Sequence, residues 1–403
     1  MHAASSAILA FTCVAWSLAI AWLWKAVTAL RGMPRLPDLT RINPETLPRL
    51  EAGSAPHLSV IIPACNEEEV IQATLRALLA STGIRLEIIA VDDRSTDRTG
   101  ARMEEVAAEA ARQPSPHLLH VLHNRALPAG WLGKPHALHL AAQQARAPWL
   151  LFTDADVTFA PHALELALRH AIAVQADHLV VTPTLIRKSI GEAIMQATLQ
   201  APLAWFVRLW KVADPRARDF IGVGGFNLVR AETYCRLGGF AGLRMEVIED
   251  MSFGCIVKRA GHRSCVSLGP GLVSIYWIKG LWGIAANTEK NGFAACRYSL
   301  PIAVAAFLAQ VALIVVPLAA VILGGWALPA GLLTYAGIAL AMRANRGING
   351  ISPLAAVLFA PAAAIISYAF VRSVIVTLVR NGVVWRGTHY PLDELRRNAI
   401  PWR

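Results

Sequence analysis

Charged residues are scarce in this sequence. Asp, Glu, Lys and Arg together make up 16% of the 403 residues, whereas hydrophobic residues make up 55%. That balance is too apolar for an ordinary soluble protein of this length, so it excludes a chain that folds entirely in water. We therefore expect a membrane protein.

Closely paired cysteines are also missing. The sequence has six cysteines, and none of them forms a Cys-x-x-Cys pair. That spacing argues against a zinc site or a disulfide framework and favours reduced, packed thiols. The net charge of +11 comes without a nucleic-acid recognition motif, and the basic residues flank apolar segments. We expect an anionic lipid bilayer as a partner, and no nucleic acid.

The first apolar segment begins near the amino end. No charged residue occurs from Ala3 to Trp24, which is enough to cross a hydrocarbon layer of about 30 Å at 1.5 Å per residue. A signal peptide is the alternative, but Lys and Arg are absent before the apolar run and follow it instead. By the positive-inside rule, this pattern predicts a transmembrane helix over residues 1–30, a linker over 31–56 and a cytoplasmic main domain in a multi-pass inner-membrane protein.

A second apolar region covers residues 299–380. Residues 300–323 and 326–342 are typical of a helical hairpin, and residues 353–379 have the composition of a last span. Three C-terminal spans would place the basic tail, residues 381–403, outside, which conflicts with the charge rule. Either the rule is violated here or one segment, around Pro361, is re-entrant.

Two shorter stretches combine Trp with Lys or Arg, a composition typical of interfacial helices. They are residues 193–207, an uncharged stretch that is followed directly by Arg208, Trp210 and Lys211, and residues 276–295; both are too short or too polar to span a bilayer. For the first of them a helix buried in a protein core is the alternative.

Between the apolar regions, strand and helix patterns alternate. Residues 58–63 and 86–91 are predicted strands separated by an apolar-periodic helix over 70–79, which indicates a parallel sheet. A further apolar run, 149–153, ends in Asp154 and Asp156, and the second strand ends in Asp93. Ligands of open α/β sheets bind beyond the carboxyl ends of the strands, so these acids are expected to converge on one crevice. Two carboxylates there suit a hard divalent cation and a diphosphate.

Six motifs in order along the chain carry a family resemblance. They are residues 61–68 (IIPACNEE), 91–97 (VDDRSTD), 133–138 (GKPHAL), 153–156 (TDAD), 224–227 (GGFN) and 249–250 (ED). Over residues 57–298 the chain resembles the family 2 glycosyltransferases of the GT-A fold. Within them it is most similar to membrane-anchored lipid glycosyltransferases, the group that contains ceramide glucosyltransferases and hopanoid-associated enzymes. The implied fold is α/β, a Rossmann-like GT-A nucleotide-sugar domain, with transmembrane α-helices at both ends.

The resemblance implies a site for a nucleotide-sugar donor. The implied donor-binding residues are Pro63, Asn66, Glu67, Asp93, Lys134, Asp154 and Arg297. Asp154 and Asp156 are the implied ligands of Mg²⁺ or Mn²⁺, hard cations that accept carboxylate and diphosphate oxygens. Lys134 either neutralises phosphate or extends along the surface.

The resemblance also implies a catalytic base. Asp250 takes a proton from an acceptor hydroxyl, which gives one displacement and inversion at the anomeric carbon. Glu249 is the alternative base. The structural alternative is that at least one of these two acids only stabilises the N-terminal end of a helix through the helix dipole. Gly224, Gly225 and Asn227 form either a wall of the sugar or acceptor pocket or a tight turn.

At one position the chain departs from its processive relatives, which carry Gln-x-x-Arg-Trp. Here Ala294 and Tyr298 replace the Gln and the Trp around Arg297, and this argues against polymer synthesis. The expected function is an enzyme that moves one sugar, from a UDP-linked donor, to a lipid hydroxyl. A polyprenyl-phosphate sugar synthase and a non-catalytic membrane scaffold or transport component are the alternatives.

Overall fold

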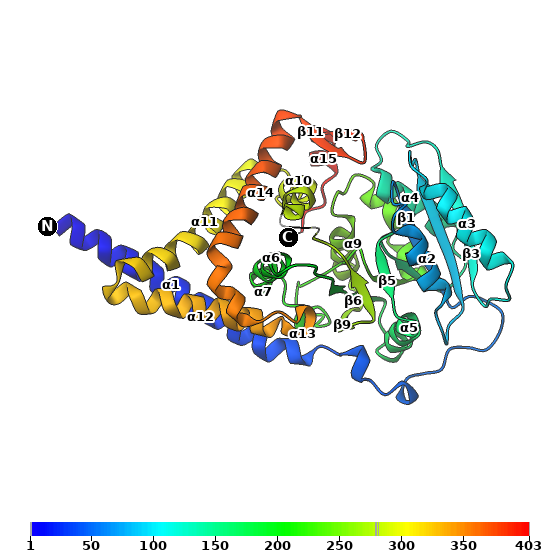
Figure 1. Ribbon diagram of the computed structural model, residues 1–403, viewed down its shortest axis with the longest axis horizontal. Helices are drawn as coiled ribbons and strands as arrows, with labels where there is room; N and C mark the ends of the chain where they lie inside the picture. Colours follow the sequence, from blue (N-terminus) through cyan, green and yellow to red (C-terminus); the bar gives the residue numbers. More distant parts are fainter. Residues whose placement is uncertain (1, 279, 281, 403) are drawn as a thin grey trace. The chain divides into compact units, whose positions relative to one another are not determined.

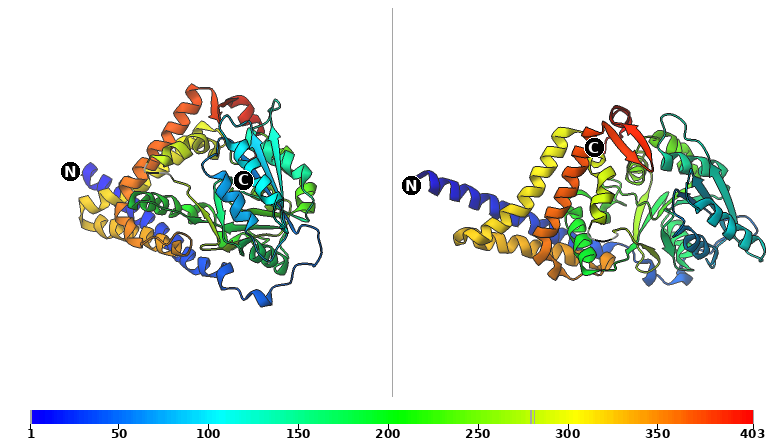
Figure 2. Two further views of the ribbon diagram at one scale, coloured as in Figure 1. Left: turned by 45° about the vertical axis from the view of Figure 1, so that its right-hand side comes forward. Right: turned by 45° about the horizontal axis from the view of Figure 1, so that its top comes forward.

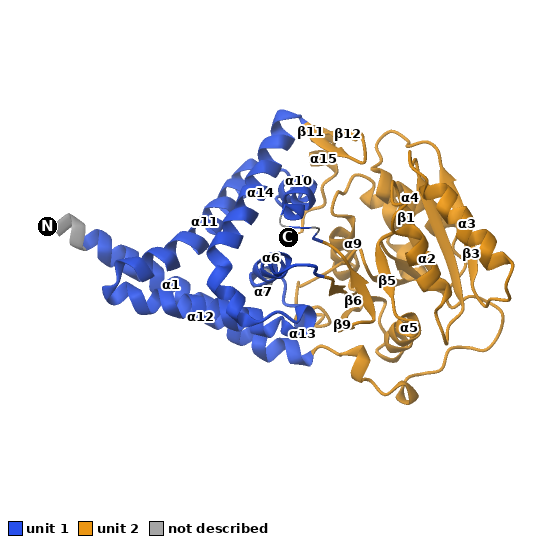
Figure 3. Cartoon of the chain, in the orientation of Figure 1, with its two compact units in different colours: residues 1–35, 187–210, 278–381 blue, residues 36–186, 211–277, 382–403 orange. Residues whose placement is uncertain are grey.

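The computed structural model describes residues 2–278, 280 and 282–402. It divides into two compact units (Figure 3). Unit 1 consists of residues 1–35, 187–210 and 278–381, and unit 2 consists of residues 36–186, 211–277 and 382–403. Each unit is therefore assembled from segments that are far apart in the sequence.

Unit 2 contains a seven-stranded sheet with the strand order β3-β2-β1-β4-β8-β6-β9. A smaller sheet has the order β5-β10-β7, and β11 pairs with β12. The bounds of the strands are β1 Leu58–Ala64, β2 Leu86–Asp93, β3 Leu118–Asn124, β4 Trp149–Phe152, β5 Val157–Phe159, β6 His178–Thr182, β7 Thr184–Leu185, β8 Asn227–Arg230, β9 Ser264–Leu268, β10 Val273–Ile275, β11 Gly382–Trp385 and β12 Thr388–Pro391. Strand β8 runs antiparallel to β4 and β6. The parallel sheet predicted from the sequence is thus a mixed one.

Helices cover both faces of the large sheet (Figure 1). The helices of unit 2 are α2 Ile71–Leu79, α3 Thr99–Ala111, α4 Gly133–Gln144, α5 Ala163–Ala173, α8 Ala231–Arg236, α9 Glu249–Arg259 and α15 Leu392–Asn398. Side chains alternate between the faces, so that Val60 and Ile62 pack with α2, α3 and α5 while Ile61 packs with α4 and α9. The period of two in a β-strand explains why β1 is buried along its whole length.

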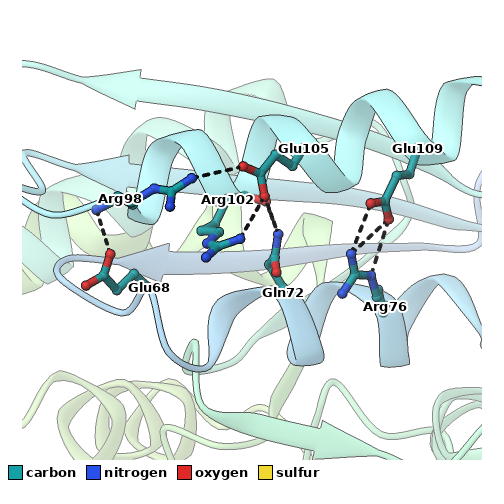
Figure 4. Close-up of polar contacts among 7 residues, drawn as sticks. All are labelled: Glu68, Gln72, Arg76, Arg98, Arg102, Glu105 and Glu109. Atoms are coloured by element: carbon teal, nitrogen blue, oxygen red, sulfur yellow. Dashed lines mark hydrogen bonds and ion pairs between the residues drawn. The ribbon is translucent and has the colours of Figure 1, made fainter.

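An exposed ion pair and a hydrogen bond join α2 to α3 on the outer surface (Figure 4). Arg76 pairs with Glu109 at 3.0 Å, and Glu105 accepts from Gln72 at 2.7 Å and from Arg102 at 3.1 Å. Exposed pairs of this kind contribute about 0–1 kcal/mol each. The buried apolar faces beneath them therefore hold these two helices in place.

The segment predicted as a linker, residues 31–56, packs in part on unit 2. Leu39 and Leu47 are buried in its larger core cluster, and the backbone of Leu268 donates to the carbonyl of Pro37 at 2.7 Å. Short 3₁₀ turns that begin after Asp38 and Asn43 shape this path. The apolar residues of the segment thus fix its course, although its Pro-rich and Arg-rich composition suggested a simple connection.

The segment predicted as a basic tail, residues 381–403, also folds. From residue 382 onward it forms β11, β12 and α15 within unit 2. Leu392 and Leu395 are buried, and the indole nitrogen of Trp402 donates to the hydroxyl of Ser252 at 3.1 Å. The high share of arginine conceals this amphipathic pattern in the sequence.

Unit 1 is helical. Its helices are α1 His2–Gly32, α6 Ile190–Gln200, α7 Leu203–Phe206, α10 Gly283–Ala295, α11 Leu300–Leu323, α12 Leu328–Ala344, α13 Arg346–Asn349 and α14 Phe359–Val379. Among the described residues, four helical segments are long and apolar enough to cross a membrane, namely Ser6–Arg35, Leu300–Leu323, Gly325–Ala344 and Pro353–Val379. The apolar helices expected near both ends of the chain are therefore present.

Two segments inside the predicted domain 57–298 belong to unit 1 instead. They are residues 187–210, with α6 and α7, and residues 278–298, with α10. These are close to the stretches for which the sequence predicts interfacial helices. Met195 of α6 and Ile284 of α10 share an apolar cluster with Ala362 of α14. The first stretch therefore packs with the apolar helices and not in the core of the sheet domain.

Candidate active site

Three parallel strands deliver acidic side chains to one edge of the large sheet. Ile61 of β1 lies in register with Ile89 of β2 and with Phe152 of β4, so the carboxyl ends of these strands reach the same edge. Asp93 is the last residue of β2, and the loop that follows β4 carries Asp154. The structure thus gathers the acids at the sheet edge where the alternation of strands and helices predicts them.

Lys134 lies at the centre of this edge. It is the second residue of α4, and its Nζ is 2.5 Å from Asp154 Oδ1 and 2.6 Å from Glu249 Oε1. Burial alone would lower the pKa of Lys134, but the negative charges of Asp154, Glu249 and Asp250 outweigh it and hold the pKa above its ordinary value. Lys134 is therefore charged and joins β4 to the start of α9, so it does not extend along the surface.

Asp250 is held at the N-terminal end of α9. Its Oδ2 accepts from the backbone N–H of Gly224 at 2.7 Å, and its Oδ1 accepts from the N–H of Met251 at 2.7 Å. Burial, followed by the charge of Glu249, raises the pKa of Asp250 to about 6. Its protonation state therefore changes close to neutral pH, in the range that suits a general base.

The glycine-rich loop closely approaches the backbone of Asp250 and the carboxylate of Asp154. A Cβ on Gly222 would lie 1.7 Å from the carbonyl oxygen of Asp250, and one on Gly224 would lie 2.6 Å from Asp154 Oδ2. A Cβ on Gly225 would meet nothing nearer than 3.6 Å. Close backbone approach thus requires glycine at the first two positions, and Gly225 has room for a methyl group.

A pocket opens between these elements. Its volume is about 230 Å³ including the solvent at its open mouth. It is lined by Lys134, Leu138, Phe152, Thr153, Gly224, Asn227, Phe240, Glu249 and Asp250. Asn227 is buried and its side-chain oxygen contacts the ring of His178, whose pKa burial lowers to about 4. Polar groups therefore converge on an apolar floor, as is usual for ligand sites.

The end of β2 forms a second part of the same edge. Asp93 is fully buried and accepts from the guanidinium of Arg94 at 3.0 Å and from the amide of Asn124 at 2.8 Å. Asn66 adopts a left-handed backbone with φ of 57°, and its side chain accepts from the N–H of Thr96 at 2.8 Å. Asn66 thus fixes the turns after β1 and β2 against each other, beside the pocket residues.

The C-terminal hairpin contributes residues to this part that sequence reasoning missed. The N–H of Gly133 donates to the Tyr390 hydroxyl at 3.2 Å, and Arg94 donates to the Thr388 hydroxyl at 3.3 Å. Arg386 has φ of 50° and lies 3.9 Å from Glu67. Sequence alone could not show where residues 384–390 lie.

The donor set suits a small divalent cation that keeps waters. In the described ranges no group of three or more His, Cys, Asp or Glu side chains is arranged to hold a metal. Mg²⁺ and Mn²⁺ sites of nucleotide enzymes commonly use one or two carboxylates together with phosphate oxygens, and Asp154 and Asp156 match that set. Lys134 is the cation that contacts three neighbouring carboxylates electrostatically, so the centre carries an excess of negative charge.

Two of the candidate residues differ in character from the rest. Pro63 lies within β1 and offers only backbone atoms to the edge of the sheet. Arg297 belongs to unit 1, where it follows α10 with a left-handed backbone, φ of 54°. The other candidates lie in unit 2.

Comparison with known proteins identifies the domain. Residues 59–251 match the model of the glycosyl transferase family 2. Among curated relatives, the 4,4'-diaponeurosporenoate glycosyltransferase of Staphylococcus haemolyticus (strain JCSC1435) is 33% identical over 142 residues, 33% of this chain and 35% of that protein. The enzyme of the same name from Staphylococcus aureus (strain USA300) is 26% identical over 199 residues, 49% of this chain and 50% of that protein. The chain thus spans half or less of the length of these relatives.

A solved structure shares the fold. The mannosyltransferase PcManGT from Pyrobaculum calidifontis, in complex with GDP-Man and Mn²⁺, matches with a TM-score of 0.52 and 19% identity over 91% of this chain and 99% of that one. The prediction of a GT-A fold is confirmed. The match to the family model identifies residues 59–251 as a glycosyl transferase family 2 domain, and the likeness to the solved structure shows the fold of that domain.

Proposed function

We propose that this protein is a membrane-bound, metal-dependent, inverting glycosyltransferase. It moves one sugar from a nucleotide-sugar donor, UDP-linked, to the hydroxyl of a membrane lipid. Three observations support sugar transfer to a lipid-like acceptor: the family 2 domain, the names of the curated relatives, and a structural neighbour that binds a nucleotide sugar. The apolar helices of unit 1 support the membrane, and the basic residues that flank α1 support a cytoplasmic domain.

The reaction is a single displacement. The Asp250 carboxylate takes the proton of the acceptor hydroxyl as the acceptor oxygen forms a bond to the anomeric carbon. The bond from that carbon to the diphosphate breaks, and the nucleoside diphosphate leaves with the electron pair. Because the acceptor attacks from the face opposite the leaving group, the anomeric configuration inverts.

Asp154, Asp156 and Lys134 bind the donor's diphosphate end. Asp154 and Asp156 would hold Mg²⁺ or Mn²⁺, which supplies positive charge that stabilises the departing diphosphate. Lys134 keeps Asp154 and Glu249 in place, at 2.5 and 2.6 Å, and adds positive charge beside the phosphates. The nucleoside end of the donor site is formed by Asp93 and by the turn that contains Asn66 and Glu67.

The state of the two neighbouring acids favours Asp250 over Glu249 as the base. Glu249 is buried and forms an ion pair with Lys134, so its carboxylate is stabilised and serves to position α9. Asp250 lines the pocket and has a pKa raised to about 6. The position of Asp250 in the pocket lining is the observation on which the mechanism rests, and a pKa near neutrality agrees with it because such a base can both accept and release the proton.

The charge of the pocket favours a neutral acceptor. A phosphate acceptor would need no base and would meet the excess negative charge of Asp154, Glu249 and Asp250. A hydroxyl acceptor avoids that repulsion and needs the base. The pocket therefore supports a lipid hydroxyl over the phosphate acceptor of a polyprenyl-phosphate sugar synthase.

Mass spectrometry of lipid products tests the proposal. The full chain in membranes is incubated with Mn²⁺, a lipid extract and a panel of nucleotide sugars, and the new glycolipid is identified by its mass. We expect Asp250→Asn to lower the rate by about 10²–10⁴-fold, the usual contribution of a general base. Nucleotide binding, measured by calorimetry, stays unchanged because Asn still accepts from the Gly224 N–H.

Glu232→Gln is the matched control. Glu232 is an exposed acid on α8 that pairs with Arg236 in the neighbouring turn. This variant should keep the wild-type rate. Equal rates for wild type and Asp250→Asn would remove Asp250 as the base and favour a phosphate acceptor. Nucleotide binding without any product from wild type would favour the scaffold alternative.

A further inference from the structure

The segments before and after the last apolar helix, α14, make contacts that bear on its place in a membrane. Hydropathy marks residues 353–379 as a candidate span, yet the contacts on each side of it point to a different position. We propose that α14 lies in the leaflet on the domain side and does not cross the bilayer. This inference rests on the proposal that the protein is membrane-bound.

The end of α14 is fixed by the segment that follows it. Residues 382–403 fold within unit 2, where Tyr390 accepts from the N–H of Gly133 and Trp402 donates to Ser252 at 3.1 Å. Ser252 lies in α9, the helix that carries Asp250. A segment held at the catalytic site is on the same side of the membrane as that site. The C-terminal end of α14 is therefore on the domain side.

The start of α14 is fixed by the loop that precedes it. Asn345 donates to the carbonyl of Gln200 at 3.2 Å, and Asn349 donates to the side-chain oxygen of Gln200 at 2.6 Å. Gln200 ends α6, an 11-residue helix within residues 187–210, and the chain belongs to unit 2 both before residue 187 and after residue 210. At 1.5 Å per residue, α6 extends about 16 Å and cannot cross and return. The loop that α6 holds is therefore also on the domain side.

The direction of α12 agrees with this placement. Along α1 and α12 the contacts advance together: the Trp16 indole donates to the carbonyl of Trp326, and a Cβ on Gly337 would meet Trp22 Cβ at 2.9 Å. The two helices are therefore parallel, and both run toward the domain side. The hairpin of α11 and α12 thus enters the membrane and returns before α14 begins.

The neighbours of α14 are suited to the membrane surface. Tyr368 packs against Trp282 at 6.3 Å, and Glu289 of α10 pairs with Arg372 at 2.5 Å and with Arg380 at 3.1 Å. Helix α10 has 13 residues and includes Glu289 and Lys290, so it is too short and too polar to span. The last three turns of α14 pack along α10.

The first turn of α14 also lies near the polar boundary, at the end of the apolar run of α1. The ring of Phe359 is 6.1 Å from the ring of Trp22, three residues before Lys25, the first charged residue after the apolar run of α1. In Figures 1 and 2, α14 runs steeply across the common direction of α1 and α12. A helix with both ends near the polar boundary and a direction across the spans lies along the interface.

The exposed side chains of α14 then contact lipid on the domain side. Tyr368, Ile375 and Val379 are 55%, 54% and 79% exposed. Aromatic residues such as Tyr368 and Trp282 are typical of the interfacial belt. With α14 in this position the chain crosses an even number of times after the domain, and the arginines of residues 380–403 obey the positive-inside rule. The conflict in the sequence disappears.

Labelling from each side of the membrane tests the inference. The two exposed cysteines, Cys13 and Cys235, are replaced by serine, and single cysteines are then introduced as reporters. Restored Cys235 reports the domain, Arg346→Cys the loop before α14, Arg397→Cys the segment after it, and a cysteine in a tag ahead of His2 reports the far side. An impermeant maleimide is applied to right-side-out and inside-out vesicles.

We expect positions 235, 346 and 397 to react in one vesicle orientation and the tag in the other. Position 397 reacting with the tag would show that α14 crosses, and position 346 reacting with the tag would show that α12 does not return. Either result overturns the inference. Sugar transfer measured on the same vesicles is independent of it, so loss of transfer with intact labelling would count against the proposed function alone.

Discussion

The two ends of the proposed donor site balance charge differently. At the nucleoside end, Asp93 is fully buried and is matched by Arg94 and Asn124. At the reaction end, Lys134 faces the three carboxylates of Asp154, Glu249 and Asp250. A matched, buried pair makes a rigid surface, whereas an excess of carboxylates attracts a cation and raises the pKa of one acid. Recognition and chemistry are thus assigned to separate groups along one sheet edge.

The largest effect, a loss of stability, is expected from removing the positive charge of Lys134 at the reaction end. Lys134→Met leaves Glu249 buried without its partner, and breaking a buried pair typically costs about 3–5 kcal/mol. Thermal and denaturant unfolding should show this loss. The double variant Lys134→Met with Glu249→Met should recover most of the stability but not the activity. If the single variant is as stable as wild type, the ion pair does not organise the site.

A large loss of activity is expected from removing one of the proposed metal ligands. Asp156→Asn removes one of the two carboxylates assigned to the cation, so activity at fixed Mn²⁺ should fall by about 10²–10³-fold, as for loss of one charge-stabilising group. Titration with Mn²⁺ should move the half-activating concentration upward. Chelation should abolish transfer by wild type. Activity that is insensitive to both chelation and Asp156→Asn would contradict the metal assignment.

The glycine loop offers a matched pair of substitutions. In Gly224→Ala the new methyl group would lie 2.6 Å from Asp154 Oδ2, whereas in Gly225→Ala the nearest atom, of Val157, is at 3.6 Å. Displacement of a reacting group by about 1 Å can cost about 10²-fold in rate. Gly224→Ala should therefore lose up to that factor while Gly225→Ala stays near wild type. Equal rates for the two variants would show that the loop moves enough to accommodate the methyl group at position 224.

The pH profile tests the shifted acid. A base must be deprotonated to act, and burial with the charge of Glu249 raises the pKa of Asp250 to about 6. The rate should therefore rise about tenfold per pH unit below 6 and level off above it. In Glu249→Gln the neighbouring charge is gone, so this inflection should move to lower pH. An inflection near 4 in wild type would show an unperturbed carboxylate.

The smallest effect is expected at the nucleoside end. Tyr390→Phe removes the hydroxyl that accepts from the Gly133 N–H at 3.2 Å. An unsatisfied backbone donor typically costs about 1–3 kcal/mol, and water at this edge should keep the loss near the lower value. The melting temperature reports it. A rate loss as large as that of Gly224→Ala would instead assign the hairpin to the reaction end.

The sequence predicted the parts of the site that follow the rules of parallel sheets. The positions of Asp93 and Asp154 were accessible because strand ends at one sheet edge must be neighbours. The GT-A fold was accessible through the resemblance carried by six ordered motifs. The pairing of Lys134 with Glu249 was not, because it joins α4 to α9 across 115 positions of sequence and depends on tertiary packing. The place of residues 382–403 was hidden for the same reason.

Hydropathy had a different limit in unit 1. It located the apolar helices of this unit, because burial in lipid requires long apolar runs. It could not assign the orientation of α14, because an interfacial helix packed on α6 and α10 can be as apolar as a span. The positive charge of residues 380–403 indicated that orientation, because three C-terminal spans would place these basic residues outside, against the positive-inside rule.

The anomeric configuration of the product tests the central claim most directly. The glycolipid made by wild type from an α-linked nucleotide sugar is isolated, and its anomeric proton is examined by NMR. The account predicts a β-linked sugar on a lipid hydroxyl, formed by wild type and reduced by about 10²–10⁴-fold in Asp250→Asn. An α-linked sugar, or a sugar attached to phosphate, would contradict it.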